Sequence, residues 1–596
     1  MLQQGIVFTV IIGALILFAQ GSIRYDFVGL GALLVLVVTG IVPAEEAFLG
    51  FGHPAVVTVA AILVVSSSLL KTGVLDQLVR IMNRSGRGIN VKIAALMIMT
   101  AVLSSFMNNV GALALVMPIA IEVGKHHRIS PSYLLMPVAF ASLLGGLITE
   151  IGTPPNLIIS TYRGSIEAEP FLFFDFAPVG VGLTLVGIIF ISTIGWHLIP
   201  KRKGDEGQSD FFRIDEYMSE VIIPVGSKYS NRTVEELLGD LNLDVNILSI
   251  IRGERSIVPP AANELLEEMD HLVIRADHSG LADLVKRTGF QFKGSKNIQD
   301  VSGKTLKDRS LVMAEIVLKD DSPAIGRTVI ELNLRHRFGV NLVAVSRRGI
   351  SSYHRLQSFI FKPGDVLLIQ CPSDSIQDVL GQLRALPLAE RGLRVGKGNR
   401  KSLKFITLVL FVTSIILTTL GILSVQISFA ACALLMVLFH IITPREFYDA
   451  IEWPIIIMLG SLLPVGDALQ STGGAETIAN IMLGAMDYLS PSLMVTVLML
   501  TTILLTNLIN NAAAAVLMAP IAISLAIKMG VSPDPMLMAV AVSASSAFMT
   551  PIGHQSNTLI MGPGGFRFGD YWRMGLPVTI IVLLVGTPLI LHFWPL

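Results

Sequence analysis

The chain has 596 residues, of which 52% are hydrophobic and only 15% are charged, with a mean hydropathy of +0.68. This composition predicts a polytopic membrane protein and excludes a soluble enzyme. The net charge is zero, so bulk charge argues neither for nor against nucleic acid, and we expect no nucleic-acid partner. Cys371 and Cys432 form no CxxC pair, so they predict neither a disulfide framework nor a cysteine-based metal site.

Apolar segments long enough to cross a membrane occur in both halves of the chain. They fall near 5–21, 27–43, 53–70, 133–160 and 172–198, and again near 405–421, 424–441, 453–470, 536–562 and 574–594. Residues 1–5 have no basic side chain and no cleavage site, so we expect the first segment to be retained as a span. In segments 92–122 and 492–525, an Asn-Asn pair leaves pieces of about 14 residues, which favours a re-entrant hairpin.

Each half contains two polar breaks within apolar sequence. They are Asn108-Asn109 and Gly152-Thr153-Pro154-Pro155-Asn156 in the first half, and Asn510-Asn511 and Gly553-His554-Gln555-Ser556-Asn557 in the second. An Asn-Asn pair followed by small residues can end one helix and start another. Free N–H groups at that start, together with the positive end of the helix dipole, predict an anion site.

The two halves match along their whole length, which indicates an internal repeat. Matching positions are Pro43 and Pro444, Pro54 and Pro454, Asn108 and Asn510, Pro118 and Pro520, and Asn156 and Asn557. Five spans and one hairpin put the two ends of a half on opposite sides, so the second half should run inverted. Inverted repeats with broken helices near the midplane are typical of secondary transporters.

The distribution of basic residues predicts the orientation. Loops expected inside contain Arg24, Lys71, Arg80, Arg84, Arg87, Lys92, Lys125, Arg128, Arg445, Arg567 and Arg573, whereas loops expected outside contain Arg163 and Lys528. We therefore expect both termini to be extracytoplasmic in a multi-pass protein of the plasma (inner) membrane. The domains are then repeat 1 at 1–203 and inverted repeat 2 at 399–596.

Residues 204–398 form a soluble insert, which basic runs on both sides place in the cytoplasm. The insert repeats with an offset of 95, so that Glu220-Val221-Ile222 matches Glu315-Ile316-Val317. Two α+β modules, at 204–300 and 301–398, are predicted, each with the order strand, short helix, strand, strand, helix. No GxGxxG follows a strand, so a dinucleotide site is not expected. A structural cap and a sensor of an unspecified ligand both remain open.

At these residues the chain resembles the divalent anion/sodium symporter family (solute carrier family 13 type), over nearly its whole length. The insert resembles a pair of TrkA C-terminal (RCK-C) regulatory domains, an arrangement similar to a branch often associated with sulfate. Gly152-Thr153-Pro154-Pro155-Asn156 closely matches the family's loop. The resemblance implies a homodimer, coupling to sodium, and an elevator motion of a transport domain against a fixed scaffold.

One departure bears on the substrate. The family's hairpin tips usually contain Ser-Asn-Thr, whereas this chain has Met107-Asn108-Asn109 and Ile509-Asn510-Asn511. The hydroxyls that touch carboxylates and sodium in dicarboxylate carriers are therefore missing, which disfavours dicarboxylates.

The expected site residues divide by role. Substrate binding is assigned to Asn109, Asn511, Thr153, Pro154, Asn156, Ser556 and Asn557; sodium binding to Asn108, Gly152, Asn510 and Gly553; and coupling to Glu150 and His554. Each has an ordinary structural alternative: asparagines that join helices, prolines that kink a helix, a glutamate that holds a loop amide, a packed histidine. No cofactor is expected, and no metal beyond sodium as coupling ion.

These expectations combine into one functional hypothesis. The chain is an α-helical polytopic membrane protein, built of inverted repeats of five spans plus one re-entrant hairpin each, with a cytoplasmic α+β insert. It is a sodium-coupled symporter of a divalent oxyanion, with sulfate favoured. The first alternative is a dicarboxylate or citrate carrier of the same fold; others are a ligand-gated ion channel and an anion sensor. An enzyme is not expected, because no nucleophile–base or metal constellation is present.

Overall fold

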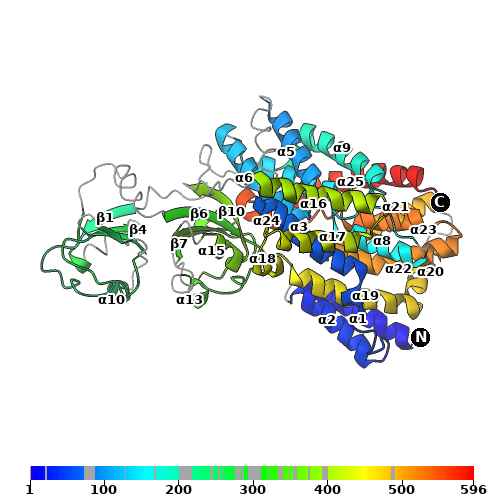
Figure 1. The fold of residues 1–596 in the computed structure, drawn as a ribbon, viewed down its shortest axis with the longest axis horizontal. Helices are drawn as coiled ribbons and strands as arrows, with labels where there is room; N and C mark the ends of the chain where they lie inside the picture. Colours follow the sequence, from blue (N-terminus) through cyan, green and yellow to red (C-terminus); the bar gives the residue numbers. More distant parts are fainter. Residues whose placement is uncertain are drawn as a thin grey trace. The chain divides into compact units, whose positions relative to one another are not determined.

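The first half of the membrane part folds into a series of apolar helices (Figure 1). These are α1 (Leu2–Gln20), α2 (Tyr25–Val38), η1 (Leu49–Gly52), α3 (Pro54–Thr72), α5 (Ile89–Ser104), α6 (Asn109–His127), α7 (Ser132–Gly146), α8 (Pro154–Ile166), α9 (Ala177–Thr193) and η2 (Gly195–Leu198). The computed structural model describes residues 2–20, 23–72, 88–127, 129–166, 169–200, 218–241, 246–252, 255–257, 260–275, 284, 287–292, 311–320, 322–332, 334, 340–347, 350–352, 359–372, 376–391, 401–484 and 490–596.

The second half contains a similar series of helices. They are α16 (Lys401–Thr419), α17 (Val425–Leu438), α18 (Pro444–Asp449), α19 (Trp453–Ser471), α20 (Gly474–Gly484), α21 (Pro491–Thr506), α22 (Asn511–Met529), α23 (Pro533–Ala544), α24 (Gln555–Gly564), η5 (Phe568–Asp570) and α25 (Tyr571–Phe593). Among the described helices, α3, α19, α22 and the η5–α25 segment are long and apolar enough to span a membrane. The described chain is thus mostly helical, which agrees with a polytopic membrane protein.

The chain divides into two compact units. The helical unit comprises Met1–Lys203, Lys397–Met561 and Phe566–Leu596, and the α/β unit comprises Gly204–Gly396 with Gly562–Gly565. Each unit has its own buried core.

Within the helical unit, the halves exchange partners. Helix α2 of the first half packs on α19 of the second, and α17 of the second half packs on α3 of the first. The backbone contact is closest at η1, where a Cβ added to Gly50 would lie 2.2 Å from Gly460 O. Because any side chain at position 50 would overlap α19, glycine is required for this approach. Helix α5 packs on α7 and α21 on α23 within a half, whereas α9 packs on α25, and α8 on α22 and α23, across the halves.

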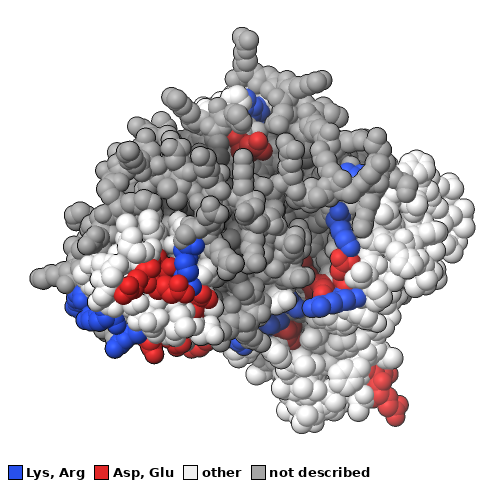
Figure 2. Space-filling view, turned by 60° about the vertical axis from the view of Figure 1, so that its left-hand side comes forward, with Lys and Arg blue, Asp and Glu red and all other residues white. Residues whose placement is uncertain are grey.

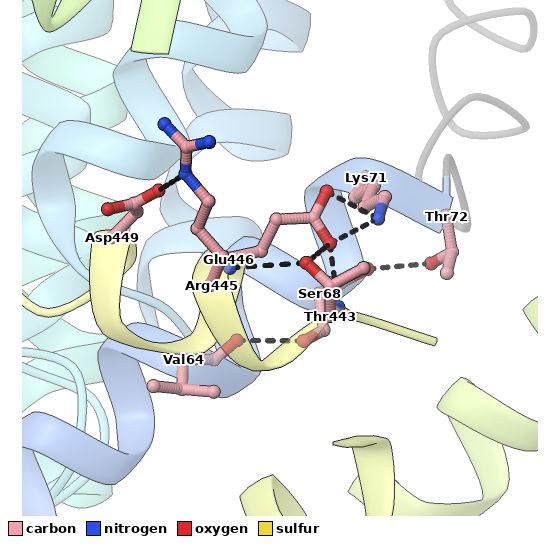
Figure 3. A network of polar contacts seen from close by, with 8 residues as sticks. All are labelled: Val64, Ser68, Lys71, Thr72, Thr443, Arg445, Glu446 and Asp449. Atoms are coloured by element: carbon pink, nitrogen blue, oxygen red, sulfur yellow. Dashed lines mark hydrogen bonds and ion pairs between the residues drawn. The ribbon is translucent and has the colours of Figure 1, made fainter. Parts of the chain in front are cut away.

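A charged contact also joins the halves (Figure 3). Lys71 Nζ, in the last turn of α3, lies 2.6 Å from both carboxylate oxygens of Glu446 on α18. Glu446 forms a capping box with Thr443, so the same carboxylate starts α18. Burial opposes ionisation of Glu446, but the bonds from Lys71 and Thr443 outweigh it, and the pKa of this carboxyl lies below its usual value.

The α/β unit contains two five-stranded sheets of the same topology. The first sheet has the order β3-β2-β4-β1-β5 and the second the order β10-β6-β9-β7-β8. The strands of the first are β1 (Met218–Ile222), β2 (Asn246–Arg252), β3 (Arg255–Ile257), β4 (His271–Arg275) and β5 (Gln291–Phe292); those of the second are β6 (Leu311–Leu318), β7 (Asn341–Arg347), β8 (Ile350–Ser352), β9 (Val366–Pro372) and β10 (Ala385–Arg391). The described helices are α10 (Val234–Leu241), α13 (Val329–Leu332) and α15 (Ile376–Leu383).

The sheets differ from the predicted order in one respect. Each contains five strands where the sequence pattern predicts three. The missed strands in the first sheet are β3 and β5, with three and two residues, and runs that short carry no readable alternation. In the second sheet, β8 is equally short, whereas β10 has seven residues and is interrupted by a register shift between Pro387 and Ala389.

The same ion pair stabilises both sheets. Arg252 donates to Asp270 at 2.9 and 2.8 Å, and Arg347 donates to Asp365 at 2.8 and 2.7 Å. Both aspartates are buried.

The view in Figure 2 shows acidic and basic side chains mostly side by side on the residues it colours.

Arg252→Ala and Arg347→Ala should each destabilise the sheet that contains them by about 3 kcal/mol, because a buried aspartate loses its charged partner. Hydrogen exchange of the full-length protein, followed separately for peptides of each sheet, measures this. The matched control is Arg445→Ala. Its ion pair with Asp449 is exposed at both ends (82% and 71%), so its loss should change exchange very little. Equal effects of all three variants would contradict the prediction.

Candidate functional site

Both Asn-Asn pairs lie at the start of a helix. Helix α5 ends at Ser104 and α6 begins at Asn109, while α21 ends at Thr506 and α22 begins at Asn511. Asn108 Oδ1 accepts the Gly111 N–H at 2.7 Å, and Asn510 Oδ1 accepts the Ala512 N–H at 2.8 Å. Each side chain therefore caps the new helix, which explains why an amide is suited to the middle of an apolar segment.

The second asparagine of each pair is held by a hydroxyl five residues earlier. Ser104 Oγ lies 2.7 Å from the Asn109 amide and donates to Ser142 O at 2.6 Å. Thr506 Oγ1 donates to Asn511 Oδ1 at 2.8 Å and lies 2.6 Å from Ala544 O. Sequence reasoning missed these hydroxyls; the available signal was a polar residue at the same place before both pairs.

The second breaks are also built alike. Asn156 Nδ2 donates to Gly146 O at 3.3 Å and Thr149 O at 2.8 Å. Asn557 Nδ2 donates to Ala547 O at 2.8 Å and Thr550 O at 3.0 Å. Each side chain thus closes the loop between two helices, α7 and α8 in the first half and α23 and α24 in the second.

Threonines connect these loops to the hairpin tips. Thr149 Oγ1 donates to Ser105 O, and Thr550 Oγ1 donates to Asn507 O. In the second half, Asn507 adds a further bond, because its Oδ1 accepts the Met549 N–H at 2.9 Å. We call the turn between α5 and α6, and its counterpart between α21 and α22, the tip of each half. In each half, the tip and the loop before α8 or α24 therefore form one polar structure.

Across the halves, Asn109 lies against His554, 445 residues further along the chain. One end of the Asn109 amide faces Gly152 O at 3.2 Å, Ser142 O at 3.0 Å and Ser104 Oγ at 2.7 Å. Amide orientation is assigned from such partners, and only Nδ2 can donate to two carbonyls. Oδ1 is therefore the end that lies 3.3 Å from His554 Nε2.

Two further contacts join the halves at this place. Ser142 Oγ lies 3.4 Å from Ser556 Oγ, and Ser545 Oγ lies 3.4 Å from Thr153 Oγ1. The rings of Phe140 and Phe548 also pack together, with centroids 5.1 Å apart. Thus Asn109, Gly152, Thr153, His554 and Ser556, which the sequence selects, meet in one region.

Two glycines outside the motifs allow helices to pack closely against these loops. A Cβ at Gly180 on α9 would lie 2.3 Å from Leu147 O, and one at Gly575 on α25 would lie 2.3 Å from Phe548 O. Sequence analysis gave no signal for either, because the loops they contact are distant along the chain.

The remaining predicted residues have other surroundings. Pro154 is the first residue of α8, and the Gly553 N–H donates to Thr550 Oγ1 at 3.1 Å. Glu150 is buried, with its N–H on Phe173 O at 3.0 Å and its side chain within hydrogen-bonding reach of Ser160. Its neighbours therefore belong to α8 and the loop before α9, and no contact with Asn109 or His554 is recorded among the described residues.

Several buried polar atoms in the region have no hydrogen-bond partner among the described residues. They are Asn156 Oδ1, Asn557 Oδ1 and Asn511 Nδ2. Buried polar groups are almost always paired, so each of these atoms can take a further partner, such as a water, an ion or a substrate group. Two amide oxygens and one amide nitrogen can bind cations and an anion. Within the described parts of the chain, no cluster of histidine, cysteine, aspartate and glutamate is suited to a metal.

Known proteins are similar in sequence to this chain over nearly its full length. The family described as citrate transporter (CitMHS) matches residues 14–541 and 490–595. An uncharacterized transporter of Synechocystis sp. is 31% identical over 99% of this chain and 96% of its own length. Another, from Escherichia coli, is 31% identical over 98% of both chains. Sodium/sulfate cotransporter 2 of Chlamydomonas reinhardtii is 26% identical over 58% of this chain and 41% of its own.

A family match over most of the chain, together with relatives of this identity and coverage, identifies the class. The protein is a multi-pass membrane transporter and not an enzyme. The chain belongs to the CitMHS citrate transporter family.

Proposed function

We propose that the protein is a sodium-coupled symporter of a divalent oxyanion, with sulfate as the favoured substrate. The observation that supports it most directly is the set of unpartnered amide atoms in the two halves. Uptake proceeds by alternating access of an elevator type, in a homodimer of the plasma (inner) membrane. The α/β insert is cytoplasmic and regulatory, built of two RCK-C-like modules.

Sodium is assigned to the two loops between broken helices. Asn156 Oδ1 and Asn557 Oδ1 are buried acceptors without a partner among the described residues, at matching positions of the halves. A buried carbonyl oxygen without a donor is a ligand that a hard cation can use. The nearby oxygens of Asn108, Gly152, Asn510 and Gly553 remain assigned to the same two ions.

The anion is assigned to the tip region between them. Asn511 is the first residue of α22, is 4% exposed, and has an Nδ2 without a partner in the part of the chain that the structure describes. Helix N-termini and amide N–H groups bind anions. Asn109, Thr153, Pro154 and Ser556 surround this position in the proposal. Asn156 and Asn557, which the sequence analysis assigned to the substrate, are assigned to sodium here because their Nδ2 groups already donate within the loops.

The relatives favour sulfate, but the family name favours a second candidate. Chlamydomonas relatives described as sodium/sulfate cotransporters, one of them as probable, match over 55–58% of this chain. The matching family is described as citrate transporter, so a dicarboxylate or citrate carrier is the alternative. The neutral hairpin tips, Met107-Asn108-Asn109 and Ile509-Asn510-Asn511, lack the hydroxyls that the dicarboxylate alternative needs.

Uptake of radiolabelled sulfate into proteoliposomes, with an inward gradient of sodium or of choline, tests the proposal. We expect accumulation only with sodium, and weak competition by excess succinate or citrate. Strong competition and direct uptake of labelled citrate would instead establish the alternative substrate. Sulfate accumulation that is equal in sodium and choline would overturn the coupling ion.

The same proteoliposomes distinguish a symporter from a ligand-gated channel and from an anion sensor. A ligand-gated channel would pass ions at rates beyond a carrier's turnover, and these would appear as currents in a planar bilayer. An anion sensor would bind sulfate saturably without accumulating it. Either result would replace the symporter.

A further inference from the structure

His554 makes two hydrogen-bond contacts that together determine its protonated nitrogen. Its Nδ1 accepts the Ser556 N–H at 3.0 Å. A backbone N–H is only a donor, so Nδ1 must carry a lone pair. A neutral imidazole then has its hydrogen on Nε2, which is a donor.

Asn109 presents the matching acceptor. Its amide nitrogen is already committed to Ser142 O and Gly152 O, so its Oδ1 faces His554 Nε2. Two independent arguments, one from the imidazole and one from the carbonyls, therefore give the same polarity for this contact. His554 holds the Asn109 amide with its N–H groups turned away from the start of α24.

The second half lacks the equivalent contact. The position that matches His554 is Thr153, whose Oγ1 lies 3.4 Å from Ser545. One end of the Asn511 amide lies against Thr506, and the other has no partner within the described residues. The tips are thus unequal: Asn109 is fully engaged, and Asn511 has one end available.

We propose that His554 is a positioning residue that sets substrate selectivity, because its Nε2–H fixes Asn109 and leaves Asn511 as the tip amide that binds the anion. This inference rests on the proposed function. A site with one amide donor at the tips suits a compact tetrahedral dianion. Two free tip amides would suit a longer ligand with a carboxylate at each end.

The test measures labelled sulfate uptake, and its competition by succinate and citrate, for His554→Leu, His554→Gln, Asn109→Ala and the Leu/Ala double variant. His554→Leu should raise the KM for sulfate about tenfold, because the variant loses one buried hydrogen bond. The maximal rate should change much less. Competition by succinate should strengthen, because the Asn109 amide can then rotate. Glutamine supplies an N–H near the Nε2 position, so His554→Gln should restore most of the affinity and selectivity.

The double variant decides whether the two residues act together. We expect it to be no worse than the more affected single variant, since both substitutions remove one contact. The inference would be overturned if the change in KM of the double variant equalled the product of the changes in the two single variants. It would also be overturned if His554→Leu kept the wild-type KM and selectivity. Should the leucine variant not reach the membrane, His554→Ala and Asn109→Ala form the same cycle.

A matched control and a direct readout separate this inference from the proposed function. His53 accepts the Ala55 N–H on Nδ1 in the same way, at the start of α3, so His53→Leu should leave selectivity unchanged. Nitrogen-15 NMR of histidine-labelled full-length protein reports the tautomer without any transport. Protonated Nε2 is expected at His554, with a shifted Nε2 resonance in Asn109→Ala; a proton on Nδ1 would disprove the geometry. Wild-type protein that moves no anion while showing this tautomer would refute only the proposed function.

Discussion

Asn511→Asp is expected to reduce sodium-driven sulfate uptake by about a hundredfold or more, because like charges brought together in a buried site cost several kcal/mol. The side chain is 4% exposed at the start of α22, so solvent screens the added carboxylate poorly. Asn511→Ala removes one donor without adding charge and should cost about tenfold. Initial uptake rates, corrected for the amount of reconstituted protein, measure both.

The control for Asn511→Asp is the same substitution at Asn480. That residue is exposed on α20, so Asn480→Asp should transport at the wild-type rate. A variant with aspartate at 511 and normal uptake would show that this amide does not bind the anion. If Asn511→Asp preserved uptake and Asn511→Ala abolished it, position 511 would be assigned to a cation instead.

Asn156→Ala and Asn557→Ala are expected to remove the stabilisation of the protein by sodium. In the wild type, sodium at a hundred times its dissociation constant should stabilise the fold by about 2.7 kcal/mol per site. Each variant loses one proposed ligand and two buried bonds, and should also be less stable without sodium by about 2 kcal/mol. Thermal unfolding in sodium chloride and in choline chloride measures both effects.

Comparison with an exposed asparagine isolates the sodium effect. Asn90 lies on the exposed side of the first turn of α5, so Asn90→Ala should keep the full difference between sodium and choline. An unchanged sodium effect in both loop variants would remove sodium from these loops. Loss in one variant only would assign a single ion and identify the half that binds it.

Local sequence signals were sufficient for the helix starts in this protein. An amide that caps its own helix needs only a few following residues, so Asn108 and Asn510 could be interpreted from the chain alone. The same holds for the loops at Asn156 and Asn557, where glycine and polar residues interrupt apolar sequence. Long-range partners are different: no pattern in the sequence encodes that His554 meets Asn109.

Other features lay beyond sequence reasoning for equally physical reasons. Glu150 was expected to serve coupling or a loop amide, yet whether a carboxylate faces one neighbouring helix or another depends on how those helices rotate. The structure places it near Ser160. The contacts of Gly180 and Gly575 with distant loops depend on the approach of whole helices, and the roles of Ser104 and Thr506 depend on the side chains that lie next to them.

The exchanged packing of α2 on α19 and of α3 on α17 has a consequence for how the chain is made. Helices α2 and α3 leave the ribosome long before their partners, because the insert between the halves must be synthesised first. At about 5–20 residues per second, translation of that insert takes on the order of 10–40 s. During this time Gly29 and Gly50, which will contact α19, face lipid or an insertion factor. Shortening this interval, or supplying the second half as a separate chain, should therefore change the yield of folded protein without altering the contacts of the folded state.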